Sequence, residues 1–145
     1  MTTTASVPAW KTAATLLARL IFGGLFIMAC VFKFTGMEGT AGYIAAAGFP
    51  VPLFLAWVAA FFELALALCF LTGAYFTEAA LLAGIYVVFL AFSFHGPSTW
   101  QGSEEIKPLL IGSFIDHFTF LAGLLFAAVN GPGRFALGNR IIGRA

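Results

Sequence analysis

Four long runs of apolar residues follow one another along the chain, separated by short segments rich in glycine, proline and polar residues. Each run is about 20 residues long, which is the length an α-helix needs to cross a lipid bilayer. The runs are continuous and lack the alternation of apolar and polar positions that marks the strands of a membrane β-barrel. The pattern therefore predicts four transmembrane helices, at about residues 12–35, 52–74, 77–95 and 108–130.

The segments between these runs differ in what they can form. Residues 36–50 are too short and too rich in glycine to span a membrane, but 40–47 can form a short helix at the membrane surface. Residues 72–78 predict a tight helical hairpin, and 96–106 form the most polar internal segment, which is expected in water. The predicted fold class is all-α integral membrane: a four-transmembrane-helix bundle with a short interfacial helix between the first and second spans. The whole chain, 1–145, is expected to be one membrane domain.

Composition removes the alternative that the apolar runs form the core of a soluble protein. Hydrophobic residues make up 61% of the chain and charged residues only 9%, whereas a soluble domain is about 25% charged. A fold of this size has too little interior to bury so much apolar surface. The net charge is only +1 and the chain has no run of basic residues, so it lacks the positive surface that binding to nucleic acid requires. We therefore expect a protein of the lipid bilayer that does not bind nucleic acid.

The distribution of Lys and Arg predicts the orientation of the helices, because the cytoplasmic ends of membrane helices carry more of these residues. With four spans both termini lie on one side, and that side collects most of the basic residues, so both termini are expected in the cytoplasm. The alternative of a signal peptide cleaved before Cys30 is disfavoured, because Arg19 interrupts its apolar stretch. The basic residues on the side of the termini are Lys11, Arg19, Arg134, Arg140 and Arg144, against Lys33 and Lys107 on the other.

Ionisable side chains inside the predicted spans are the strongest chemical signal in the sequence. Each costs at least about 2.5 kcal/mol at the centre of a bilayer unless it is paired or hydrated. Counting residues along antiparallel helices places Arg19 within reach of Glu63, and we expect these two to form an ion pair. Lys33 lies farther from Glu63 by the same count and is expected to extend to the outer interface.

The fourth predicted helix carries a polar face that includes Asp116 and His117. The same residue count puts Asp116 level with Glu63, so these residues are expected to face the bundle interior. Two alternatives remain: the charges only form ion pairs that fix helix packing, or the helix begins near Ile115 and leaves Asp116 and His117 in water. The face consists of Ser113, Asp116, His117 and Phe120; the predicted polar core consists of Arg19, Glu63, Asp116 and His117, with Lys33 and His95 at its outer mouth.

Neither haem nor metal is expected in this polar core. A bis-histidine haem needs histidines at equal depth on facing helices, but the residue count separates the levels of His95 and His117 by roughly 12 Å. Adjacent residues on a helix point about 100° apart, so Asp116 and His117 are not predicted to join Glu63 around one ion.

Two stretches of the sequence carry a resemblance to a known family. ARLIFGGLFIMACVFKFTG in the first span and GYIAAAGFPVPLFLAWVAAFFELALAL leading through the second, with a histidine closing the third, are similar to the DoxX family of small four-helix bacterial membrane proteins. The resemblance runs from about residue 18 to 131, and its most specific parts include Gly23 and Glu63. The family pattern has a basic residue and an asparagine entering the fourth helix, where this chain has Asp116 and His117.

The resemblance implies a function and a location in the bacterial inner membrane. The DoxX family takes its name from a subunit of a terminal quinol oxidase system. The likeness implies a membrane subunit or accessory protein of a quinone-linked oxidoreductase, with no covalently bound cofactor, in which Glu63, Asp116 and His117 hydrogen-bond a quinone or exchange its protons. Two other classes stay open. One is a structural subunit that packs against other membrane or redox subunits or its own copies through faces of small residues, and the other is an oligomeric small-molecule transporter.

Overall fold

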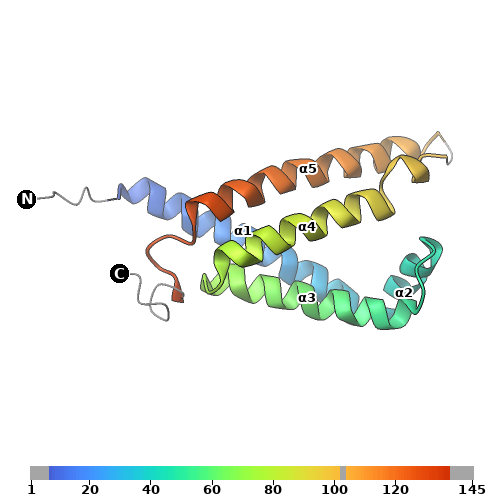
Figure 1. The fold of residues 1–145 in the computed structure, drawn as a ribbon, viewed down its shortest axis with the longest axis horizontal. Helices are drawn as coiled ribbons and strands as arrows, with labels where there is room; N and C mark the ends of the chain where they lie inside the picture. Colours follow the sequence, from blue (N-terminus) through green and yellow to red (C-terminus); the bar gives the residue numbers. More distant parts are fainter. Residues whose placement is uncertain (1–6, 102–103, 138–145) are drawn as a thin grey trace, which may run out of the picture.

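The computed structural model describes residues 7–101 and 104–137. These ranges contain five α-helices, one 3-10 turn and no strand, so the predicted all-α class and the short helix between the first two spans are confirmed. Four of the helices are long and apolar enough to cross a membrane. The elements are α1 (Ala9–Thr35), α2 (Met37–Ala46), α3 (Pro52–Thr72), α4 (Phe76–Phe94), the 3-10 turn η1 (Pro97–Thr99) and α5 (Lys107–Asn130) (Figure 1).

The ends of α2 and α3 differ slightly from the predicted bounds. α3 ends at Thr72 because Gly73 adopts a left-handed φ of 74° and donates its N–H to the Cys69 carbonyl at 2.8 Å. This is a common way to end a helix, since glycine adopts the left-handed conformation without steric penalty. α2 begins at Met37, earlier than predicted, and ends at Ala46.

The start of α5 decides between two predictions for Asp116 and His117. α5 begins at Lys107 with Pro108 in its first turn, where proline removes no helical hydrogen bond. Asp116 therefore lies about 13 Å along the helix from Lys107, at a rise of 1.5 Å per residue. The alternative that the helix begins near Ile115 is wrong, and both polar residues lie inside the span.

The helices pack in two pairs joined by α3 and α4. α1 packs mainly against α3, α4 mainly against α5, and α2 lies on α3. The start of α1, the turn between α3 and α4 and the end of α5 lie together at one end of the bundle, here called the terminal end (Figure 1). α2 and the connection between α4 and α5 lie at the opposite end, here called the α2 end. Lys11 and Arg134 line one hollow at the terminal end, whereas Arg140 and Arg144 lie outside the described residues.

Small residues let the helices approach one another, and aromatic rings fill the space between them. A Cβ atom on Gly23 would lie 2.5 Å from the Leu71 side chain, so only glycine lets α1 approach α3 here. The rings of Phe26 and Phe70 stack beside this contact with centroids 5.7 Å apart. α4 adds a face of alanines to the same core, which lies between α1, α3 and α4: Ala79, Ala80 and Ala83.

α5 is the least buried of the four long helices. Leu124 is its only buried residue, and the large apolar side chains of Val129, Phe126 and Leu109 are 87%, 71% and 70% exposed. In a bilayer such side chains contact lipid or the helices of another protein. α5 therefore presents most of its surface outward from the bundle.

Candidate functional site

Glu63 of α3 is the centre of a buried polar cluster. It is 2% exposed, and its Oε1 accepts hydrogen bonds from Lys33 Nζ and from the Tyr86 hydroxyl, each at 2.8 Å. Its other carboxylate oxygen, Oε2, is buried and has no hydrogen-bond partner among the described residues. The predicted pair of Arg19 and Glu63 is wrong: the cation beside Glu63 is Lys33, which was expected to extend to the outer interface.

The register between α1 and α3 explains this correction. The residue count assumed that α1 ends and α3 begins at the same depth. Instead, Gly23 lies against Leu71 and the Phe34 ring lies 5.9 Å from that of Trp57, which shifts α3 outward by one to two turns, or about 6–10 Å. α2 and its connections take up this offset before α3 starts, and Lys33 rather than Arg19 comes within reach of Glu63.

Arg19 instead forms hydrogen bonds at the terminal end. Arg19 as a whole is 4% exposed, and its guanidinium donates to four backbone carbonyls. Two of these belong to the last turn of α3, where helix carbonyls lack partners and carry a partial negative charge. The acceptors are Phe70 O at 3.1 Å, Leu71 O at 2.6 Å, Pro132 O at 3.2 Å and Phe135 O at 2.7 Å. Arg19 thus fastens the segment after α5 to the end of α3 and takes no part in the cluster around Glu63.

The two histidines of the chain lie side by side at the α2 end. The ring centroids of His95 and His117 are 5.1 Å apart, so the predicted separation of roughly 12 Å in depth is wrong. The chain continues outward through η1 after His95, and the Trp100 ring packs 5.7 Å from that of Phe114, so α5 starts farther out than α4 ends. The His117 side chain also leans toward the N-terminal end of its helix, as helical side chains do, and this brings it toward His95.

The hydrogen bonds of the two histidines determine which ring nitrogens are left to donate or accept. His117 Nδ1 lies 2.6 Å from the Ser113 carbonyl. Because a carbonyl only accepts, this nitrogen carries the proton, and in the neutral ring Nε2 is left as an acceptor. His95 Nδ1 is buried without a hydrogen-bond partner among the described residues. The backbone of His95 is fixed by the Trp100 indole, which donates to its carbonyl at 2.8 Å.

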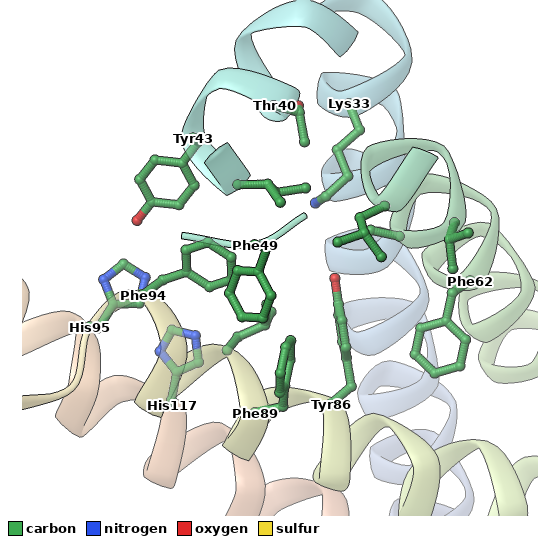
Figure 2. Close-up of a pocket in the computed structure, with 15 residues that line it drawn as sticks. Lys33, Thr40, Tyr43, Phe49, Phe62, Tyr86, Phe89, Phe94, His95 and His117 are labelled. Carbon is green, nitrogen blue, oxygen red and sulfur yellow. The ribbon is translucent and has the colours of Figure 1, made fainter. Parts of the chain in front are cut away.

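A cavity of about 440 Å³ lies between α2, α3 and α4, with His117 of α5 on one side. Figure 2 shows Lys33 and Tyr86 on one side of this cavity and the two histidines on the other, with aromatic rings between them. Partial burial raises the pKa of the Tyr43 phenol on its wall, which keeps this hydroxyl protonated. We call this space the aromatic cavity; its lining includes Lys33, Thr40, Tyr43, Phe49, Phe62, Tyr86, Phe89, Phe94, His95 and His117.

A second cavity of about 410 Å³ lies on the other side of Tyr86 and the histidines, between α1, α4 and α5. It brings together Glu63, Asp116 and His117, three of the four residues of the predicted polar core, and leaves out Arg19. Asp116 itself is exposed rather than buried. We call this space the carboxylate cavity; its lining includes Phe26, Glu63, Tyr86, His95, Ser113, Asp116, His117 and Phe120.

Tyr86 and the phenylalanines of the aromatic cavity were missed by the sequence analysis. Tyr86 is the signal that could have been used, since a phenol inside an apolar span needs a hydrogen-bond partner. The phenylalanines carry no such signal, because the chain has 18 of them and lipid contact explains each equally well. Within the described residues, no group of three or more His, Cys, Asp or Glu side chains converges to hold a metal ion.

Comparison with known proteins places this architecture in a family. The DoxX family model matches residues 14–96, which include Lys33, Glu63, Tyr86 and His95. The chain is 31% identical over 122 residues to the inner membrane protein YqjF of Escherichia coli, covering 84% of this chain and 87% of the relative. It is 28% identical over 125 residues to the inner membrane protein YphA of the same organism, covering 86% and 88%. No solved structure matches the chain significantly. The chain is therefore a membrane protein that belongs to the DoxX family.

Proposed function

We propose that this protein is a membrane subunit or accessory protein of a quinone-linked oxidoreductase system in the bacterial inner membrane, and that its aromatic cavity binds the quinone head group. The observation that carries the proposal is the combination of aromatic walls with polar groups on opposite sides of one cavity of about 440 Å³. Binding sites for small organic molecules have volumes of about 300–1,000 Å³ and a few convergent polar groups in an apolar lining.

The polar groups of the aromatic cavity suit a flat ring with two carbonyl acceptors. The Lys33 ammonium has three N–H groups and uses one of them for Glu63. His95 Nδ1 is buried, has no hydrogen-bond partner within residues 7–101 and 104–137 and can present an N–H. These two donors come from α1 and from the end of α4, on opposite sides of the cavity (Figure 2), so each can reach a different carbonyl of one ring.

A bound quinone would supply two-electron redox chemistry, and the residues of this chain would bind it, orient it and hold protons beside it. Glu63 keeps Lys33 in the wall of the cavity, and the Tyr86 phenol donates to the same carboxylate oxygen. His117 lines the cavity beside His95, and one nitrogen of its neutral ring donates a proton while the other accepts one. Lys33, Tyr86 and the histidine pair thus offer exchangeable protons on both sides of the proposed head group.

The proposal is tested by purifying the protein in mild detergent and measuring the quinone extracted from it. We expect quinone to co-purify with the wild type. His95→Leu removes one donor while the protein stays folded, and should lower the retained quinone about five-fold, the loss for one hydrogen bond worth about 1 kcal/mol. Phe54→Leu is the control, because Phe54 is 65% exposed on α3 and does not line the cavity. The proposal fails if the wild type neither retains quinone nor binds an added short-chain quinone in nanodiscs.

A second candidate function is that of a structural subunit, and the exposed face of α5 favours it. A helix with Leu124 as its only buried residue leaves a long apolar face free to pack against another membrane protein. A photo-crosslinker at Val129, which is 87% exposed, should then yield a discrete adduct in intact membranes. Crosslinking to lipid alone would contradict this candidate and leave the quinone proposal unaffected.

We also propose that the terminal end faces the cytoplasm, because Lys11, Arg19 and Arg134 lie at this end. In a protein with Cys30 and Cys69 replaced by alanine, Gln101→Cys should react with an impermeant thiol reagent added outside whole cells. Asn130→Cys should react only after the membrane is opened. The reverse labelling pattern would overturn the orientation.

A further inference from the structure

The carboxylate cavity contains a buried acceptor that the proposed quinone site does not use. Glu63 is 2% exposed and lines this cavity, yet its Oε2 has no hydrogen-bond partner among the described residues. A buried carboxylate oxygen without a partner is unfavourable, because it has lost its hydrogen bonds to water and gained none in the protein. A ligand that donates a hydrogen bond to this oxygen would remove that penalty.

The charge of the carboxylate cavity favours a cation as that ligand. Asp116 of α5 is a second carboxylate in the lining, whereas none of the described residues that line the cavity is Lys or Arg. Lys33 is bonded to Glu63 Oε1 but lines the aromatic cavity and not this one. With Lys33 offsetting the charge of Glu63, the Asp116 carboxylate is left without a cationic partner among the described residues.

The shape and lining of the cavity favour a molecule over a single ion. Glu63, Asp116 and the two histidines do not converge closely enough for three of them to hold one ion. The cavity has a volume of about 410 Å³, and Phe26, Tyr86 and Phe120 give it aromatic walls. Aromatic faces attract organic cations, and a body of several apolar atoms fills the space that a metal ion would leave empty.

We propose that the carboxylate cavity binds a primary ammonium group attached to an apolar body, with Asp116 as its counter-ion and Glu63 Oε2 as its buried hydrogen-bond acceptor. His117 Nε2 is a further acceptor on the same wall. Two sources carry this chemistry in a bacterial membrane: a free amphipathic amine and the ethanolamine head group of a phospholipid. The site goes beyond the proposed quinone site, since Asp116 and Phe26 line the carboxylate cavity alone.

The test measures binding of radiolabelled tryptamine to the protein in nanodiscs made of phosphatidylcholine. Tryptamine has a flat ring and a primary ammonium, and tryptophol has the same ring with a neutral hydroxyl. We expect saturable tryptamine binding, with tryptophol competing at least about ten-fold more weakly because hydrogen bonds between charged groups are the stronger ones. Equal competition by tryptophol, or no saturable binding of tryptamine, would overturn the proposal.

Two variants connect the binding to the cavity. Asp116→Asn should weaken tryptamine binding about ten-fold, because it removes the counter-ion and keeps the side-chain volume. Glu78→Gln is the matched control: Glu78 is an exposed carboxylate in the first turn of α4, at the terminal end, and its loss should leave binding unchanged. Wild-type affinity in Asp116→Asn, or equal weakening in both variants, would show that the amine binds elsewhere.

A second set of nanodiscs identifies the source of the amine. If the head group of phosphatidylethanolamine is the occupant, nanodiscs that contain this lipid should raise the apparent Kd for tryptamine, and Asp116→Asn should abolish that increase. An unchanged Kd in these nanodiscs assigns the cavity to a free amphipathic amine. In either case Asp116→Asn should retain quinone as the wild type does, so this proposal and the quinone proposal can fail separately.

Discussion

The buried charged residues toward the two ends of the bundle differ in how completely their hydrogen bonds are satisfied. At the terminal end the Arg19 guanidinium donates to four backbone carbonyls, two of which belong to the last turn of α3, where carbonyls have no partner within the helix. Toward the α2 end Glu63 accepts both of its hydrogen bonds on Oε1. Its Oε2 and the Nδ1 of His95 are buried without a hydrogen-bond partner among the described residues. The terminal end is therefore built for stability, whereas the α2 end keeps polar atoms that a ligand could satisfy.

This difference teaches that a charge inside a membrane span does not by itself mark a functional site. Arg19 and Glu63 are both almost fully buried, and both are unfavourable in a bilayer when left alone. What separates them is the state of their hydrogen bonds: Arg19 directs four of its five N–H groups to backbone carbonyls, whereas one carboxylate oxygen of Glu63 has no partner among the described residues. Substitutions at the two ends should therefore affect different properties of the protein.

The largest loss of stability is expected from Arg19→Gln. The shorter side chain leaves most of the four carbonyls unpaired and releases the segment after α5 from α3. We expect a decrease of at least about 3 kcal/mol in the free energy of unfolding, measured by denaturant titration in detergent. Arg19→Lys should recover only part of this, because an ammonium cannot match the planar fork of the guanidinium. A loss below about 1 kcal/mol would show that this contact is not central to the fold.

The next largest effect is expected at the pair of Lys33 and Glu63. Each of Lys33→Met and Glu63→Gln should decrease the unfolding free energy by about 2–3 kcal/mol, because the first leaves a buried carboxylate and the second a partly buried ammonium without its partner. The double variant should lose less than the sum, by a coupling of about 1–2 kcal/mol. By contrast, Arg19→Gln combined with Glu63→Gln should be additive, since these residues share no contact. Coupling between Arg19 and Glu63 would contradict the register of α1 and α3.

The sequence predicts the positions of the membrane helices well, because each helix corresponds to one continuous apolar run. A continuous apolar run of about 20 residues can satisfy its backbone in a bilayer only as a helix, and Gly73 adopts the positive φ that ends α3 close to where the apolar run stops. The face of α5 that carries Asp116 and His117 also follows from helical spacing alone, and the structure brings both residues to the carboxylate cavity.

The partners of the polar residues could not be predicted because they depend on offsets between helices. A shift of one to two turns between α1 and α3 places Lys33 instead of Arg19 beside Glu63, and the sequence does not specify how far α2 carries the chain before α3 begins. The contact of His95 with His117 likewise depends on η1 and on the direction in which a helical side chain leans. The partners of these polar residues could therefore be identified only once the register of the helices was known from the structure.

A smaller effect on stability is expected from Gly23→Ala, which tests how tightly α1 packs against α3 near the terminal end. A Cβ at Gly23 would lie 2.5 Å from the Leu71 side chain, whereas one at Gly24 would have open space around it. Gly23→Ala should therefore decrease the unfolding free energy by about 1–2 kcal/mol through overpacking, and Gly24→Ala should leave it unchanged. Equal effects of the two neighbours would mean that the approach of α1 to α3 is looser than the contact with Leu71 indicates.

The smallest effect on stability is expected from Asp116→Asn, and it completes the comparison between the ends. Asp116 is exposed and no hydrogen bond or ion pair fixes it to another described residue, so the unfolding free energy should change by no more than about 0.5 kcal/mol. The same substitution should weaken amine binding about ten-fold by removing the counter-ion. Arg19→Gln should show the opposite pattern: it destabilises the bundle strongly, but at temperatures where the variant stays folded it should bind tryptamine as the wild type does. Measuring both properties in both variants separates a residue that holds the helices together from one that serves the cavity. A large loss of stability in Asp116→Asn would mean that this carboxylate has a structural partner and that the two ends do not differ in the way proposed.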